Sequence, residues 1–263
     1  MSKLEDANLN RNSKITSIAN LNPTFCYENE KISSAVDKIL TTKHRRLPIT
    51  SKKKILVGII TITDILDAFL REEDFSKKLS NIMIREPIFC YEDDTIGFVL
   101  QKFKLSRRGG FPIVDRKMKL LGMVSERDYV WRFSNVKFGV KVEEVMSKKP
   151  IVASPHISIF DCLRTMVNVR YRRLPVVEKG KLVGIVTSVD TLSYLKNNKF
   201  ERESLDEELN LIYKTEVFTI DKNEEISTAI KIMKERDVGG LLVVDDSELK
   251  GILTERDILE RIE

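Results

Sequence analysis

A fourfold internal repeat most constrains how this chain of 263 residues folds. The same pattern, a glycine, two apolar residues, a hydroxyl residue and an aspartate three positions later, recurs at 58–64, 122–128, 184–190 and 251–257. The four aspartates are 64, 62 and 67 residues apart. A second series keeps the same period: Leu47-Pro48, Phe111-Pro112, Leu174-Pro175 and Leu241-Leu242. A third consists of Pro23, Pro87, Pro150 and Val217. Repeats of one period indicate one supersecondary unit used several times, here of about 60 residues.

Each repeat has the same hydrophobic pattern. A short apolar strand at 25–27, 89–91, 151–153 or 217–219 precedes a segment whose apolar residues recur with the helical period. Two further strands follow, separated by a charged turn, and a second helix begins at the glycine pattern. The sequence therefore predicts an α/β fold of strand, helix, strand, strand, helix. Two helices cover only one face of such a sheet, so the repeats must pack against one another.

The repeats alternate in detail. Repeats 1 and 3 carry Arg45-Arg46 and Arg172-Arg173 where repeats 2 and 4 carry Gly109-Gly110 and Gly239-Gly240. The even repeats also share Glu-Arg-Asp at 126–128 and 255–257. This alternation indicates that a pair of repeats was duplicated, which predicts two modules, 14–135 and 136–263. A charged segment at 196–213, expected to be helical, would link them.

These residues resemble the cystathionine-β-synthase (CBS) domain, and the chain resembles a stand-alone protein of four such domains. The domains would span 14–75, 76–135, 136–198 and 199–263. The resemblance implies that paired domains form Bateman modules whose clefts often hold adenosine compounds. Four domains in one chain also resemble the gamma subunit of AMP-activated protein kinase, in which two modules make a disc.

Composition limits the other possibilities. Lys and Arg exceed Asp and Glu by 45 to 40, a mild excess of +5 among interleaved charges, which is a weak indication of an anionic partner. Three distant cysteines without metal-ligand spacing favour a reducing cytoplasm and predict no metal site. No apolar run is long enough to span a membrane, and the first 14 residues do not resemble a secretory signal. With two histidines and no nucleophile, phosphate-loop or metalloprotease motif, we expect no enzyme activity and no catalytic cofactor.

The hydroxyl and aspartate of each pattern have two interpretations. A hydroxyl before a helix with an acid three residues later is a capping box, which needs no ligand. A helix N-terminus also attracts phosphate, and an acid one turn inside accepts ribose hydroxyls in dinucleotide folds. By resemblance to the family, the ribose would be bound by Asp64, Asp128, Asp190 and Asp257. The phosphate would be bound by Thr61, Ser125, Thr187 and Thr254.

The residues flanking the pattern also leave alternatives open. Arg45, Arg46, Arg172 and Arg173 lie where family members contact phosphate, which a planar guanidinium suits, or they are solvated surface arginines. The glycine pairs either let a ligand approach the backbone or serve a turn. The base would lie near Thr24, Ile88, Ile151 and Val217, unless these are core residues.

The leading hypothesis is a cytoplasmic regulatory protein that binds AMP, ADP or ATP in its clefts and signals a change in module packing to an unidentified protein partner. Alternatives are an interaction module without a ligand, an S-adenosylmethionine binder, and a nucleic-acid binder using its basic segments. A monomeric disc and a homodimer are both compatible with the sequence.

Overall fold

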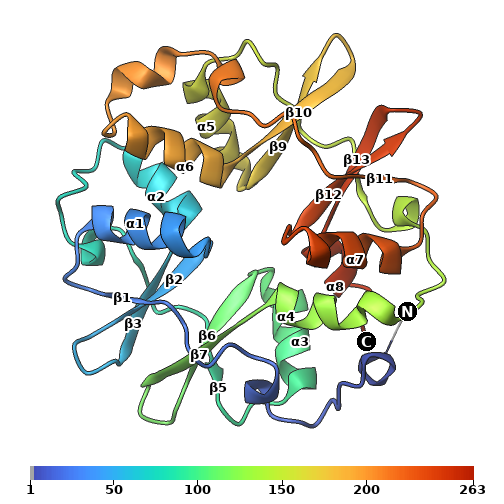
Figure 1. Ribbon diagram of the computed structural model, residues 1–263. Helices are drawn as coiled ribbons and strands as arrows, with labels where there is room; N and C mark the ends of the chain where they lie inside the picture. Colours follow the sequence, from blue (N-terminus) through green and yellow to red (C-terminus); the bar gives the residue numbers. More distant parts are fainter. Residues whose placement is uncertain (1–2) are drawn as a thin grey trace. The chain divides into compact units, whose positions relative to one another are not determined.

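The structure is a computed structural model that describes residues 3–263 (Figure 1). Its helices are α1 (Ile32–Thr42), α2 (Ile62–Leu70), α3 (Ile96–Ser106), α4 (Glu126–Val130), α5 (Ile159–Val169), α6 (Ser188–Asn197), α7 (Ile226–Glu235) and α8 (Glu255–Leu259). Its strands are β1 (Cys26–Tyr27), β2 (Arg46–Thr50), β3 (Leu56–Thr61), β4 (Ile84–Arg85), β5 (Cys90–Tyr91), β6 (Gly110–Val114), β7 (Leu120–Ser125), β8 (Ser147–Lys148), β9 (Arg173–Glu178), β10 (Lys181–Thr187), β11 (Thr219–Asp221), β12 (Gly240–Asp245) and β13 (Glu248–Thr254). The predicted α/β fold with four repeats is confirmed.

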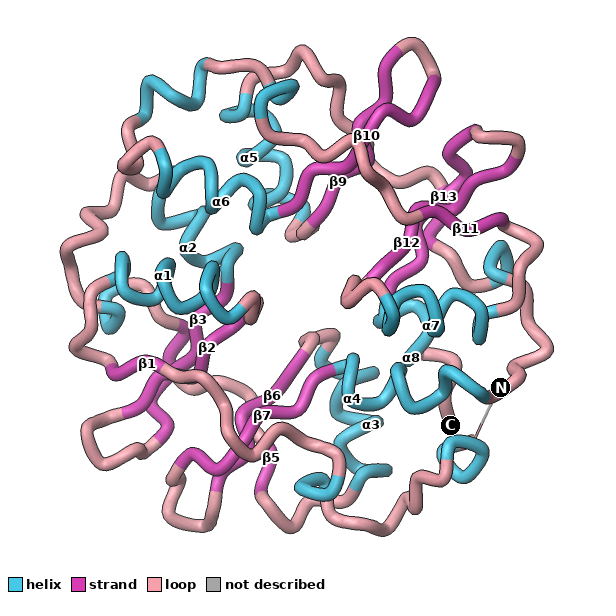
Figure 2. Tube along the Cα trace, in the orientation of Figure 1, coloured by secondary structure: helices cyan, strands magenta, loops and turns pink. Residues whose placement is uncertain are grey.

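Each repeat is built on an antiparallel hairpin, β2–β3, β6–β7, β9–β10 or β12–β13 (Figure 2). In three repeats a short strand, β1, β5 or β11, pairs in parallel with the first strand of the hairpin. Repeat 3 keeps only a bridge between Ala153 and Val176 at this place, so the strand expected at 151–153 is reduced to one residue.

The helices form because their apolar residues share one face. In α1 the buried residues are Ile32, Ala35, Val36 and Ile39, at the spacing that a period of 3.6 places on one side. Burying each large aliphatic side chain contributes about 1.5–3 kcal/mol. The helix ends at Thr42, and the next residue, Lys43, has a φ of 58° in the left-handed region that closes many helices.

Contacts divide the chain into two compact units. Unit 1 consists of residues 1–23, 88–150 and 218–263, and unit 2 of 24–87 and 151–217. The chain therefore passes between units directly after Pro23, Pro87, Pro150 and Val217, the third series of the repeat. The units combine repeat 2 with 4 and repeat 1 with 3, because α4 packs on α8 and α2 packs on α5 and α6. The pairing of repeats in modules 14–135 and 136–263 remains a prediction.

Each unit has its own buried core. The core of unit 1 gathers side chains from α3, β6, α7 and β12 together with Leu4 and Ile15 from the N-terminal segment. The Leu4 amide donates to the Glu263 carbonyl at 3.1 Å, which fixes this segment beside the C-terminus (Figure 1). Unit 2 has two clusters of buried side chains, and the larger one joins α1 and α2 to α5 and α6.

Four segments, which we call the exchanged segments, leave the repeat that they precede and pair with another repeat. They are 14–20, 78–85, 141–148 and 208–214. Segment 78–85 carries β4 onto β3 of repeat 1, and segment 141–148 carries β8 onto β13 of repeat 4. The other two make bridges with β7 of repeat 2 and β10 of repeat 3. The exchange is reciprocal between repeats 1 and 2 and between repeats 3 and 4.

The segment expected to be helical at 196–213 is different in the structure. After α6 it makes two short 3₁₀ helices, Arg202–Asp206 and Leu209–Leu211. Leu205 and Leu209 are buried, and Lys214 bridges β10. A stretch that must follow a sheet edge closely has no room for a continuous helix.

Candidate functional site

The start of the second helix has the same backbone geometry in all four repeats. The residue that pairs across the hairpin with the capping hydroxyl residue is Arg46, Gly110, Arg173 or Gly240. The carbonyl of the preceding residue accepts the first amide of the helix, at 3.2, 3.4, 2.9 and 3.3 Å in repeats 1 to 4. The arginine and glycine pairs therefore lie directly beside the N-termini of α2, α4, α6 and α8.

The capping box is present in every repeat. In repeat 1 the Thr61 amide and hydroxyl both donate to Asp64 Oδ2, at 2.8 and 2.7 Å. The same two bonds join Ser125 to Asp128, Thr187 to Asp190 and Thr254 to Asp257, at 2.6 to 2.9 Å. The structural interpretation of the pattern is thus satisfied. The hydroxyl proton already points to the carboxylate, so a phosphate contact needs the hydroxyl to rotate. The capping box itself uses only Oδ2 of each aspartate.

The surroundings of that second oxygen differ between repeats. Asp190 Oδ1 forms an ion pair with Lys214 Nζ at 2.7 Å, and the Asp190 side chain is 7% exposed. Asp257 Oδ1 accepts a hydrogen bond from the Ser147 hydroxyl at 3.1 Å. Burial raises the pKa of the Asp128 carboxyl above its usual value. The four sites are chemically unequal although their backbones agree.

The flanking residues support some of the earlier alternatives over others. All four arginines of the two pairs are partly buried, and Arg45, Arg46 and Arg173 have interaction partners, so they are not simply solvated. The glycine pairs have no φ in the left-handed region, in contrast to Gly139 and Gly180, so a turn does not require them. The candidate base contacts are not core residues: Ile88 is 45% and Ile151 39% exposed, and Thr24 and Val217 are half-buried. The assignment of these residues to phosphate and base stays a prediction.

The glycine of the pattern has a structural reason that the sequence did not reveal. A Cβ on Gly58, Gly122, Gly184 or Gly251 would lie 2.5–3.0 Å from a backbone carbonyl oxygen of an exchanged segment. These oxygens belong to Ile84, Asn20, Lys214 and Ser147 respectively. The glycine therefore permits the exchanged segment to approach this closely.

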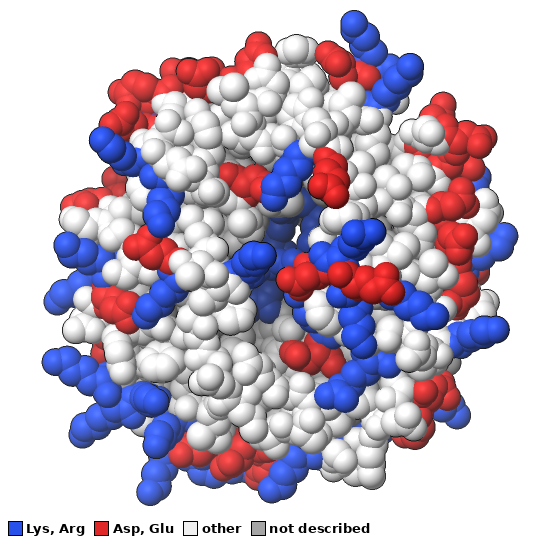
Figure 3. Space-filling model, viewed as in Figure 1, with Lys and Arg blue, Asp and Glu red and all other residues white. Residues whose placement is uncertain are grey.

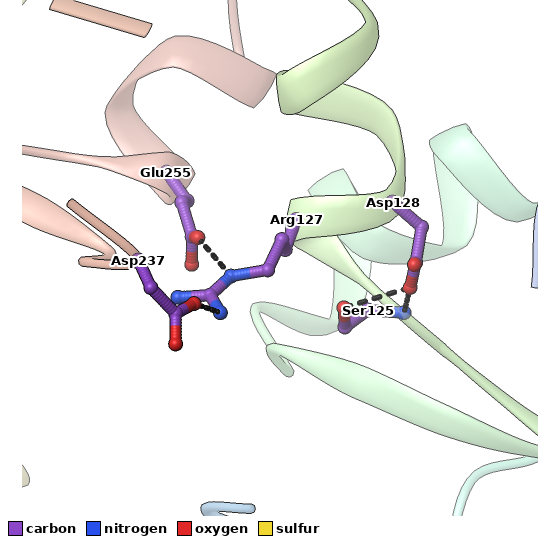
Figure 4. A network of polar contacts seen from close by, with 5 residues as sticks. All are labelled: Ser125, Arg127, Asp128, Asp237 and Glu255. Atoms are coloured by element: carbon purple, nitrogen blue, oxygen red, sulfur yellow. Dashed lines mark hydrogen bonds and ion pairs between the residues drawn. The ribbon is translucent and has the colours of Figure 1, made fainter. Parts of the chain in front are cut away.

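Sequence reasoning noticed the Glu-Arg-Asp triplets of the even repeats but not their role, which Figure 4 shows for Arg127 and Glu255. Arg127 Nε donates to Glu255 at 2.8 Å, and Arg256 donates to Glu126 at 2.7 Å. Both glutamates are buried, and Arg127 also contacts Asp237 at 2.6 Å. In unit 1 the residues next to Asp128 and Asp257 are thus joined by two reciprocal ion pairs.

Comparison with known proteins decides the family. The CBS domain matches residues 15–71, 79–134, 142–197 and 209–263. This chain belongs to the CBS-domain family. Its four repeats are CBS domains 1 to 4.

Two relatives match this chain over most of its length. The chain is 30% identical over 260 residues to the uncharacterized protein MJ1225 of Methanocaldococcus jannaschii, covering 89% of this chain and 93% of that protein. The crystal structure of MJ1225, described as a proposed archaeal homologue of the AMPK gamma subunit, has a TM-score of 0.88 and covers 94% of this chain and 99% of that one. An uncharacterized protein of Thermofilum pendens is 28% identical over 242 residues, with 83% and 80% of the two chains covered.

Basic and acidic side chains both lie on the face shown in Figure 3, and basic side chains gather along its lower left edge. Within residues 3–263 no helix is long and apolar enough to cross a membrane.

A hollow of about 470 Å³ in unit 2 is lined by Glu28, Asn29, Ser51, Lys52, Lys53, Lys78 and Ser80. It lies at the turn of the β2–β3 hairpin, at the opposite end from Arg46 and Thr61, so it is separate from the candidate site.

Proposed function

We propose that this CBS-domain protein binds adenosine nucleotides at the N-termini of α2, α4, α6 and α8 and acts as a regulatory protein. The observation that carries the proposal is the register that places Arg46 opposite Thr61 and Arg173 opposite Thr187. In domains 1 and 3 this register sets one arginine of each pair across from the capping residue, beside a helix N-terminus and a carboxylate. The similarity to MJ1225 supports the same function.

The chemistry of this arrangement fits a nucleoside phosphate. A guanidinium binds two phosphate oxygens at once, and the helix N-terminus carries partial positive charge. The Oδ1 atom of the aspartate remains to accept ribose hydroxyls, while Oδ2 stays with the cap. S-adenosylmethionine offers the arginines only one carboxylate beside its positive sulfonium, whereas AMP, ADP or ATP offers phosphate, so the nucleotides are the better candidates.

We infer a regulatory role from the four CBS matches, which cover residues 15–263 with only short gaps between them. A ligand shifts a conformational equilibrium by its difference in affinity for the two states. We propose that nucleotide binding changes the packing of the modules and that a protein partner in the cytoplasm responds, without any reaction catalysed by this chain.

Calorimetric titration with AMP, ADP, ATP and S-adenosylmethionine tests the ligand. We expect AMP to bind and Asp64→Asn to weaken one site by roughly tenfold or more, the value of a hydrogen bond to a charged group. Asparagine keeps an acceptor for the Thr61 amide, so the cap survives. Asp67→Asn, on the same helix but paired with Arg71 at the surface, is the matched control and should leave affinity unchanged.

A second variant tests the phosphate contact separately from the ribose. Arg172→Met should weaken AMP binding and leave adenosine binding unchanged. Absence of any response to all four ligands at millimolar concentration would instead support the interaction module, and a salt-dependent shift of DNA or RNA would support the nucleic-acid alternative.

A further inference from the structure

One position next to each candidate site differs in all four domains. It is the residue of the exchanged segment that pairs with the residue directly after the signature glycine. It is Ile84 opposite Ile59, Asn20 opposite Met123, Lys214 opposite Ile185, and Ser147 opposite Ile252, in domains 1 to 4. The same backbone position thus presents an apolar, an amide, an ammonium and a hydroxyl side chain.

This position reaches the candidate ribose acceptor in two domains. The Lys214 ammonium lies 2.7 Å from Asp190 Oδ1, and the Ser147 hydroxyl lies 3.1 Å from Asp257 Oδ1. Both contacts use the oxygen that the capping box leaves over, since Thr187 and Thr254 bond Oδ2. Ile84 has no polar group to offer Asp64, and the Asn20 side-chain oxygen accepts the amide of Asn22 at 2.9 Å.

The charge of Lys214 makes domain 3 different from domain 4. A neutral hydroxyl that donates one hydrogen bond is replaced by a ribose hydroxyl at little cost, because one neutral donor exchanges for another. The Lys214 ammonium neutralises the Asp190 carboxylate. When a neutral diol displaces the ammonium, this ion pair is lost and the carboxylate gains hydrogen bonds from neutral donors instead. The exposed position of Lys214, whose side chain is 64% exposed, limits the size of this effect.

We propose that this position of the exchanged segment sets the relative affinity of the four sites. With Lys214 at this position, domain 3 binds nucleosides with a free 2′,3′-diol more weakly than it would with a serine. The inference rests on the proposed function, because it assigns a role to residues around the same carboxylates. Lys214 acts as an internal occupant that a ligand must displace from Asp190.

Exchanging the two residues tests the proposal. Lys214→Ser gives domain 3 the residue of domain 4, and Ser147→Lys does the reverse. Titration with AMP should show one site strengthened by about three- to tenfold in Lys214→Ser, and one site weakened by a similar factor in Ser147→Lys. Lys214→Ser combined with Asp190→Asn assigns the gain to domain 3, since the gain should disappear in the double variant.

The outcomes separate this inference from the proposed function. If the natural chain binds AMP and Asp64→Asn weakens it, but both exchanges leave every affinity unchanged, the role of Lys214 is overturned and the nucleotide function stands. If the natural chain and the exchanged variants all fail to bind AMP, the proposed function is overturned and this inference with it. Thermal unfolding of both variants checks that neither exchange disturbs the fold.

Discussion

Arg127 donates to Glu255 at 2.8 Å across 128 residues of sequence, and the neighbouring Arg256 and Glu126 repeat the contact in reverse at 2.7 Å. The two ion pairs tie α4 to α8 in unit 1. In unit 2 the residues at the matching positions, Ile62 and Ser188 among them, carry no charge. The even domains are therefore joined by charge where the odd domains are joined by neutral packing.

These ion pairs should contribute measurably to stability. We expect Glu126→Gln to lower the free energy of unfolding by about 1–2 kcal/mol, because it leaves the partly buried Arg256 without its charged acceptor. A double-mutant cycle with Arg256→Met should give a coupling energy of about 1 kcal/mol. The exposed pair Arg71–Asp67 serves as control, with an expected coupling below about 0.5 kcal/mol. Equal coupling in both cycles would contradict a special role for the buried pair.

A second prediction concerns Gly184, which the exchanged segment approaches closely. Gly184→Ala should destabilise the protein by about 1–3 kcal/mol, because its Cβ would lie 2.5 Å from the Lys214 carbonyl oxygen. Hydrogen exchange at the Ile185 and Lys214 amides, which bond each other's carbonyls at 2.9 and 2.8 Å, should accelerate.

Gly97→Ala is the matched control for this substitution. The three atoms nearest to its Cβ all belong to the Arg11 side chain, which can rotate away, and alanine favours the helix α3. We expect a change within about 1 kcal/mol of the natural chain. A loss at Gly97 as large as that at Gly184 would show that the added methyl group, and not the exchanged segment, is responsible.

His156 predicts a pH dependence in domain 3. A hydrogen bond to Glu178, and to a smaller extent one to Glu208, raises the pKa of the His156 imidazole above its usual value. The stabilisation from these contacts should therefore be complete below about pH 6.5 and disappear as pH rises through the raised value. The difference in melting temperature between the natural chain and His156→Gln should be larger at pH 5.5 than at pH 8.5. An equal difference in melting temperature at both pH values would exclude a contribution from the charged His156.

The cysteines should be unreactive in the native protein. Burial raises the pKa of Cys26 to about 11 and those of Cys90 and Cys162 to about 12, so few thiolates exist at pH 8. All three side chains are fully buried. A thiol reagent at pH 8 should label none within minutes and all three in denaturant. Rapid labelling of any cysteine without denaturant would contradict the packing around it.

Much of the fold could be predicted because local patterns determine it. The helical stripe of α1 and the hydroxyl-to-aspartate spacing at Thr61 and Asp64 are features of neighbouring residues, and the structure forms the expected helix and cap. The Gly184 contact and the Arg127–Glu255 pair depend on residues far apart in sequence. Periodicity contains no information on such partners, so the exchange of segments and the coupling of α4 to α8 were missed.

The four passages of the chain between units have a consequence for biosynthesis. Neither unit is a continuous stretch of sequence, so the usual order in which an N-terminal domain folds while the ribosome makes the next one is not open to this protein. Unit 2 becomes complete only when residue 217 has left the ribosome, and unit 1 only with residues 218–263. The helix faces of repeats 1 and 2 that pack on repeats 3 and 4 therefore stay uncovered until those later repeats are translated.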